Sequence, residues 1–158
     1  MGLDQYLSKR EYVSGFSLSQ EKAKYDAIVE IMGWGDDVTQ DSPSMYVSAT
    51  VAYWRKANAI HAWFVRECAD GVDECQPIPV SQEKLEELLA IANKAAKDYD
   101  EGRLGEAASI LVPTSGCFFG STEVDEWFRA DLGLTISQIS KALSNAGEYA
   151  EFTYQASW

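Results

Sequence analysis

The chain has 158 residues, of which 46% are hydrophobic and 24% charged, and its formal net charge is −12. This length and composition fit a single globular domain, residues 1–158, that needs no metal or disulfide to stabilise its core. The acidity argues against direct contact with nucleic acid or an anionic membrane. No apolar run reaches the ~20 residues of a membrane-spanning helix, so we expect no membrane segment.

The negative charge is concentrated in the second part of the chain. Residues 1–66 carry seven Lys/Arg and eight Asp/Glu, whereas residues 67–158 carry six and seventeen. Such a surface attracts a basic partner at long range, most strongly at low salt. The alternative is that the acidity only keeps a small protein in solution.

The three cysteines, Cys68, Cys75 and Cys117, are an odd number in a chain without a charged and apolar leader. This pattern favours reduced thiols and a cytoplasmic location over a secreted disulfide framework. Neither C-x-x-C nor H-x-x-x-H occurs, and each carboxylate pair fits a solvated helix face or a loop. The sequence therefore predicts no metal site and no cofactor.

In the first half of the chain, alternating Tyr and Val predict a strand within residues 1–13. A helix follows, with Ser19 as its N-cap and Gly33 as its end, and then a loop over 33–44. Residues 45–54 alternate as a strand does and run without a breaker into a helix that we expect from Trp54 onward and that ends at Asp70-Gly71.

In the second half, a loop over 71–79 precedes the clearest helix, which spans 81–102 with Ser81 as its N-cap and Gly102 at its end. Residues 108–120 are predicted to form a hairpin, and residues 122–145 a helix in two pieces separated at Gly133. The tail from residue 148 predicts a last strand. Together these elements predict an α+β fold, an antiparallel sheet of about four strands packed with three to four helices.

The segment PTSGCFFGSTEVDEW, residues 113–127, raises the first functional hypothesis. Its two glycines and the following helix start suggest a phosphate-binding loop, but no Lys follows them, and carboxylates in the first turn would repel an anion. We therefore favour a capped helix, with Thr122 and Asp125 in a capping box, or an acidic turn that receives a partner. The predicted partner-binding residues are Glu123, Asp125, Glu126, Trp127 and Asp131.

The second hypothesis rests on YWRKANAIHAWFV, residues 53–65. If this segment is helical, Trp54, Asn58 and His61 share one face with Arg55 beside them, and His61 is a candidate general base or ligand contact. The alternative is that His61 is a hydrogen-bonded core residue. No nucleophile can be assigned by spacing, so no catalytic residue is named. A site for a nucleotide-like ligand would comprise Trp54, Arg55, Asn58, His61, Gly116, Gly120, Ser121 and Thr122.

Three stretches together carry a resemblance: MGLDQYL, VAYWRKANAIHAWFV and PTSGCFFGSTEVDEWF. They resemble a group of small phage and prophage proteins that open with Met-Gly-Leu-Asp-x-Tyr-Leu, and the likeness extends over nearly the whole chain. In that group the late motif usually reads Gly-Phe-Phe-Phe-Gly-Ser-Thr, and Cys117 stands where the motif has Phe, so the resemblance implies no catalytic thiol. It implies a phage accessory protein made in a bacterial cytoplasm.

The leading functional expectation is a phage protein that binds and inhibits a host protein with a basic surface, such as a defence or nucleic-acid-handling protein, without catalysis. The alternatives are a protein that binds or sequesters a nucleotide-like small molecule, a small enzyme, and a structural or virion-associated protein. Self-association into a homo-oligomer is left open.

Overall fold

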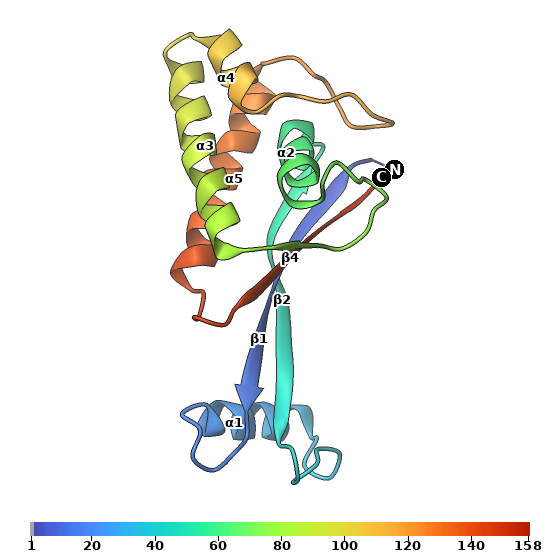
Figure 1. Ribbon diagram of the computed structural model, residues 1–158, viewed down its shortest axis with the longest axis vertical. Coiled ribbons are helices and arrows are strands. Elements are labelled where there is room, and N and C mark those ends of the chain that lie inside the picture. Colours follow the sequence, from blue (N-terminus) through green and yellow to red (C-terminus); the bar gives the residue numbers. More distant parts are fainter. Residues whose placement is uncertain (1) are drawn as a thin grey trace.

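The computed structural model describes residues 2–158 and has the expected α+β fold (Figure 1). The four strands form one antiparallel sheet in the order β2-β1-β4-β3. The elements are β1 (Asp4–Ser14), α1 (Lys22–Met32), β2 (Ser44–Arg55), α2 (Asn58–Cys68), β3 (Ile78–Val80), α3 (Gln82–Asp100), α4 (Leu104–Ile110), α5 (Glu126–Ser144) and β4 (Glu151–Ser157).

Alternate residues of neighbouring strands point to the same face of the sheet, and one of the two faces is buried. Leu7 of β1 lies opposite Ala52 of β2 and Tyr154 of β4, and all three are buried. Helix α2 contacts this face through Phe64, whose ring stacks on Tyr154 with centroids 4.0 Å apart. Helix α5 packs on β2, and α3 packs along α5 (Figure 1). The other face of the sheet carries exposed tyrosines of β1 and β2.

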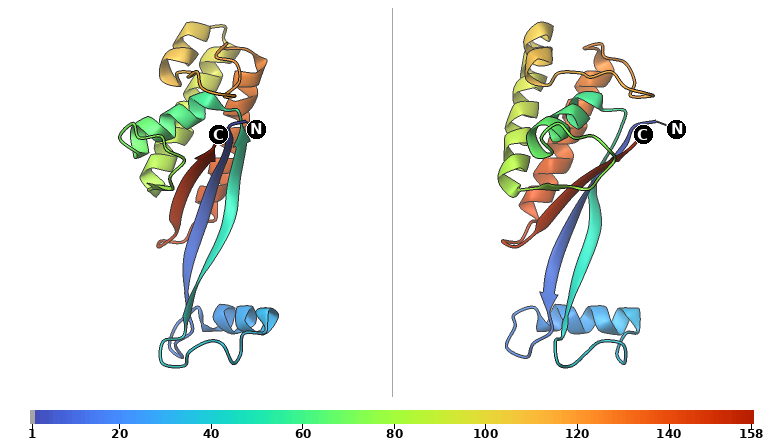
Figure 2. Two further views of the ribbon diagram at one scale, coloured as in Figure 1. Left: turned by 90° about the vertical axis from the view of Figure 1, so that its right-hand side faces the viewer. Right: turned by 45° about the vertical axis from the view of Figure 1, so that its right-hand side comes forward.

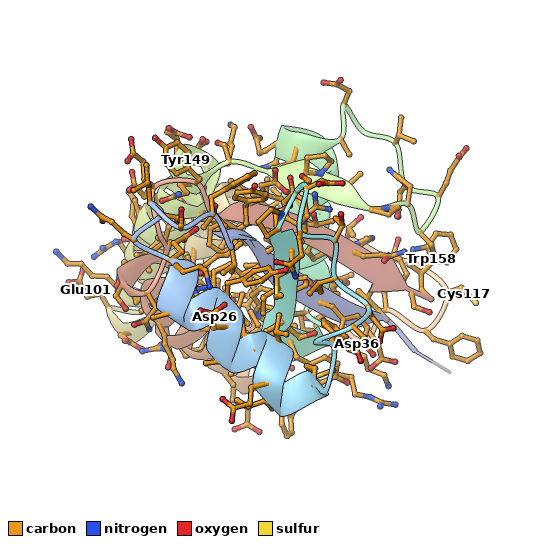
Figure 3. All side chains as sticks on the ribbon, turned by 90° about the horizontal axis from the view of Figure 1, so that it is seen from below. Asp26, Asp36, Glu101, Cys117, Tyr149 and Trp158 are labelled. Carbon is orange, nitrogen blue, oxygen red and sulfur yellow. The ribbon has the colours of Figure 1, made fainter. Side chains whose placement is uncertain are left out.

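The β1–β2 pair is longer than the rest of the sheet. It runs from Asp4 opposite Arg55 to Ser14 opposite Ser44, whereas β4 pairs only with residues 4–10 of β1. The remaining two-stranded ribbon projects away from the helices, and α1 lies across its far end (Figures 1 and 2). Figure 3 looks at this end from below, with Asp26 on α1 and Asp36 on the loop that follows.

Two predictions for the first half of the chain are wrong in detail. Ser19 does not cap α1: its hydroxyl accepts from the N–H of Glu21, and the helix begins at Lys22. Trp54 and Arg55 belong to β2 rather than to a helix. Lys56 adopts a left-handed conformation, with φ of 60°, which turns the chain and lets α2 begin at Asn58. The predicted stop at Gly33 is confirmed by its φ of 69°.

In the second half, the helix over 81–102 is confirmed, with the Ser81 hydroxyl accepting from the N–H of Lys84. The predicted hairpin over 108–120 is wrong: the short helix α4 buries Ala107 beside α3, and a loop follows it. The predicted loop over 71–79 ends in a strand, β3.

Helix α5 is continuous, because Gly133 and Thr135 lie inside it. The Thr135 hydroxyl donates to the carbonyl of Asp131 instead of capping a second helix. The cap of α5 is Asp125 rather than Thr122. No helix within residues 2–158 combines the length and the apolar character needed to cross a bilayer.

Candidate functional site

The main candidate site is a cavity of about 310 Å³ between the end of β2, the start of α2, the loop before α5 and the first turns of α5. It unites residues from both sequence hypotheses. Those from the acidic set are Glu123, Asp125, Trp127 and Asp131, and those from the ligand set are Arg55, Asn58, Gly120 and Ser121. Apolar side chains, including Ile60, Phe128 and Leu132, complete the wall.

The wall of the cavity is fixed by Asn58, the first residue of α2. Its side-chain amide donates to the carbonyls of Phe119 at 3.2 Å and Ser121 at 2.8 Å, and its oxygen accepts from the N–H of Thr114 at 3.2 Å. Because these three bonds tie the 113–121 loop to α2, the loop has a defined position although it forms no regular structure. Asn58 therefore shapes the cavity, and its polar atoms are already engaged.

Gly120 lets the same loop approach Lys56 closely. Its φ is +94°, a conformation that favours glycine, and a Cβ there would lie 3.3 Å from the Cβ of Lys56. A glycine of the sequence motif thus permits a turn and a backbone contact instead of forming a phosphate cradle.

The acidic side of the cavity is formed by the start of α5. Asp125 is the N-cap, and its carboxylate accepts from the N–H groups of Trp127 at 3.0 Å and Phe128 at 3.1 Å. Asp131 lies one turn further along and has neither a side-chain hydrogen bond nor an ion pair with any residue in the described part of the chain. Burial, and to a smaller extent the charge of Asp125, raises the pKa of Asp131 to about 7.

The basic side of the cavity is formed by Arg55 and Lys56, and only Arg55 has an ion pair with a described residue. Arg55 lies 3.7 Å from the carboxylate of Asp4, an ion pair that partly neutralises it. Lys56 has no ion pair within residues 2–158 and is exposed. Trp127 stands at the rim with 71% of its surface exposed. The cavity therefore combines an exposed aromatic ring, three carboxylates and two cations.

Two residues of the proposed ligand site lie elsewhere. Trp54 is fully buried, and its indole N–H donates to the hydroxyl of Thr135 at 2.9 Å. His61 is 2% exposed, with Nδ1 2.8 Å from the hydroxyl of Tyr154 and Nε2 3.0 Å from the carboxylate of Asp73. Because both ring nitrogens have partners, neither is free to take a proton from a ligand. The geometry is that of a hydrogen-bonded core histidine.

The remaining predicted residues lie outside the cavity. Glu126, Gly116 and Thr122 are exposed and do not line it. A Cβ at Gly116 would come within 2.5 Å of the ring of Phe119, so this glycine allows the loop to pack on that ring. No group of three or more His, Cys, Asp or Glu side chains in residues 2–158 is arranged to hold a metal ion.

Sequence reasoning did not identify Lys56 or Pro113, which also line the cavity. The sequence carries no glycine or proline at the β2–α2 junction, so nothing marks the turn that brings Lys56 to the site. Comparison with known proteins finds no matching family model, no matching curated protein and no matching solved structure. The geometry of the site is therefore the basis for its function.

Proposed function

We propose that this chain is a non-catalytic binding protein whose cavity receives a cationic group, a Lys or Arg side chain, from the surface of a basic partner protein. The observation that carries this proposal is Asp131. Its carboxyl group is partly buried, lines the cavity and makes no ion pair with any described residue, and burial holds its pKa at about 7. An incoming cation would supply the missing partner and favour the ionised form.

The other walls of the cavity favour the same ligand. Trp127 presents an exposed ring beside the carboxylates of Glu123 and Asp125, and a cation over an indole face gains roughly 0.5–2 kcal/mol. The net charge of −12 adds long-range attraction for a basic surface. In the setting that the sequence resemblance implies, the partner is a host protein with a basic surface, such as a defence or nucleic-acid-handling protein, and binding inhibits it.

The acidic wall also weighs against a nucleotide as ligand, because a phosphate would meet the same carboxylates. A thermal-shift panel of nucleotides and cyclic dinucleotides separates the two functions: a saturable rise in Tm would support the small-molecule alternative. We expect no rise.

The test is an affinity pull-down from bacterial lysate with identification by mass spectrometry, followed by a binding titration with the captured protein. The test variant combines Glu123→Gln, Asp125→Asn and Asp131→Asn, which removes three carboxylates from the cavity. The helix keeps a capping side chain at residue 125, because Asn also caps helices. We expect at least a 10-fold loss of affinity.

The control variant combines Asp70→Asn, Glu74→Gln and Glu86→Gln. These side chains are exposed, make no ion pair among the described residues and lie outside the cavity, so the control changes net charge equally. We expect it to lower the affinity only slightly, through long-range charge. Equal losses in the two variants, or a captured partner without a basic surface, would contradict the proposal.

A further inference from the structure

The ribbon formed by β1 and β2 leaves one sheet edge open. β2 is an outer strand of the sheet, and its backbone groups that point away from β1 alternate along the strand. Those of Tyr53 point outward, because both bond to Gln138. The register shifts between Leu7 and Ser8, which leaves Val51 as an extra residue in β2.

Beyond this bulge, the backbone N–H and C=O groups of the odd-numbered β1 residues still point toward β2. The bond from the N–H of Gly15 to the carbonyl of Pro43 shows this. In β2, the residues opposite even-numbered β1 residues therefore direct their backbone N–H and C=O groups away from β1. These residues are Ser44, Tyr46, Ser48 and Thr50. Their outward N–H and C=O groups have no hydrogen-bond partner in the described chain.

Proteins usually protect such an edge with charge, proline or a short strand. The opposite edge of this sheet follows the rule, since β3 has three residues and contains Pro79. The β2 edge does not: residues 44–51, SMYVSATV, contain no charged residue and no proline, in a chain that is 24% charged. This segment combines high β-propensity with free backbone groups, which is the chemistry of strand addition.

The end of α1 and strand β2 both carry exposed apolar side chains. Helix α1 lies across the far end of the ribbon (Figures 1 and 2). Near this end the exposed fractions are 82% for Ile31, 52% for Met32 and 39% for Trp34. On β2 itself, Tyr46 is 55% and Val47 39% exposed. A chain added at the β2 edge would cover part of Tyr46 and Val47, which belong to the edge strand itself.

We propose that a second copy of this chain adds at the β2 edge, so that two β2 strands pair antiparallel in a twofold homodimer. Antiparallel pairing lets one surface match itself. With the axis beside Val47, Tyr46 of one copy pairs with Ser48 of the other, and Ser44 with Thr50.

The edge suits a second copy because the antiparallel pairing is self-complementary about Val47 and residues 44–51 of the strand carry no charge. Two chains of net charge −12 repel each other, so they can associate closely only where each is uncharged, and residues 44–51 are such a stretch.

The test is sedimentation velocity of the full chain over about 1–100 μM, with Ser48→Pro and Ser48→Ala. Proline at residue 48 removes an outward N–H and leaves the bonds to β1 intact, whereas alanine keeps the N–H. We expect wild type and Ser48→Ala to sediment as dimers, and Ser48→Pro to dissociate at least 10-fold more readily. Far-UV circular dichroism establishes that the proline variant is folded.

Two further variants keep the test decisive if Ser48→Pro does not fold. Val47→Glu places two like charges opposite each other at the axis and should also weaken the dimer. In a Cys117→Ser background, Val47→Cys should form a disulfide-linked dimer on mild oxidation, because residue 47 meets its own copy at the axis. Thr50→Cys should not, since Thr50 then faces Ser44 of the other copy.

The dimer should strengthen as salt rises, because salt screens the repulsion between the two chains, whereas binding of a basic partner at the cavity should weaken. The dimer does not depend on the proposed function, and the opposite salt responses keep the two tests separate. A wild-type monomer at 100 μM would overturn the proposal. So would a dimer that resists Val47→Glu and a folded Ser48→Pro, or Val47→Cys chains that never cross-link.

Discussion

The side chain of Gln138 on α5 pairs with both outward backbone groups of Tyr53 on β2. Its oxygen accepts from the N–H at 2.7 Å, and its nitrogen donates to the C=O at 3.0 Å. A side-chain amide thus takes the place of a neighbouring strand and satisfies the β2 edge where the helices cover it. Beyond the bulge, no side chain of residues 2–158 bonds to the outward groups of this edge, so Gln138 marks where protection of the edge ends.

Replacing Gln138 with Ala should lower the free energy of unfolding by about 1–2 kcal/mol, because two backbone groups lose their protein partners and regain only solvent. Urea denaturation measures the change. Ser137→Ala, one residue earlier on an exposed position of α5, is the control and should stay within ±0.5 kcal/mol of wild type. A loss for Gln138→Ala no greater than that of the control would show that the pairing contributes nothing.

The chain of bonds from Asp73 through His61 and Tyr154 to Gln5 should act in stability and not in chemistry. The Tyr154 hydroxyl donates to the Gln5 oxygen at 3.0 Å and lies 2.8 Å from His61 Nδ1. Tyr154→Phe would leave both groups buried without that partner, so we expect a loss of about 1–3 kcal/mol.

Thermal or urea unfolding measures this loss, and Tyr149→Phe, at a residue that is 80% exposed, is the control with the same chemical change. We also expect Tyr154→Phe to leave partner binding at the cavity unchanged, since Tyr154 does not line it. Weaker binding by a folded Tyr154→Phe variant would instead link the network to function.

The accuracy of the sequence predictions follows from how local their causes are. The helix at 81–102 needed only its apolar stripe and the cap at Ser81, both of which lie within the segment itself. The prediction of a hairpin at 108–120 is wrong because its first residues belong to the short helix α4, which packs on α3, and the apolar pattern of the segment alone does not report this packing.

The candidate site shows the same division between local and distant causes. The acidic start of α5 was visible in the sequence, whereas its meeting with Arg55 and Asn58 depends on the turn at Lys56 and on the three bonds from Asn58 to the 113–121 loop. These bonds join residues 56 to 63 positions apart, and no spacing rule predicts them.

Asp131 should make stability depend on pH in a direction opposite to that of most carboxylates. Its pKa is raised to about 7 in the folded chain, against roughly 3.9 when unfolded, so folding favours the protonated form. Its contribution is fully present below pH ~4 and is lost as pH rises through 7. The Asp131→Asn variant has no carboxyl group to ionise at this position, so its free energy of unfolding does not fall for this reason as pH rises.

We therefore expect Asp131→Asn to gain on the order of 1–2 kcal/mol over wild type between pH 4.5 and pH 8, after allowing for the partial exposure of the carboxyl group. Urea unfolding of both proteins at the two pH values measures the difference, and other titrating groups cancel in the comparison. A difference that does not change with pH would show that Asp131 ionises normally. Asp131→Asn should also abolish any strengthening of cation binding between pH 6 and pH 8.

The attachment of α1 to the ribbon should depend on the space beside Gly15. Tyr25 is the buried residue of α1, and a Cβ at Gly15 would come within 2.7 Å of its ring and 2.9 Å of Pro43. Gly15→Ala must therefore displace Tyr25 and loosen α1, while α2, α3 and α5 lie in a separate core. Amide hydrogen exchange should rise at least 10-fold in residues 22–32 and stay unchanged in α2, α3 and α5.

The Tyr25 hydroxyl is buried without a hydrogen bond in the described chain, so Tyr25→Phe should leave exchange in α1 unchanged or slow it. Faster exchange in Tyr25→Phe, or uniform loosening of the whole chain in Gly15→Ala, would mean that α1 is held by something other than this ring.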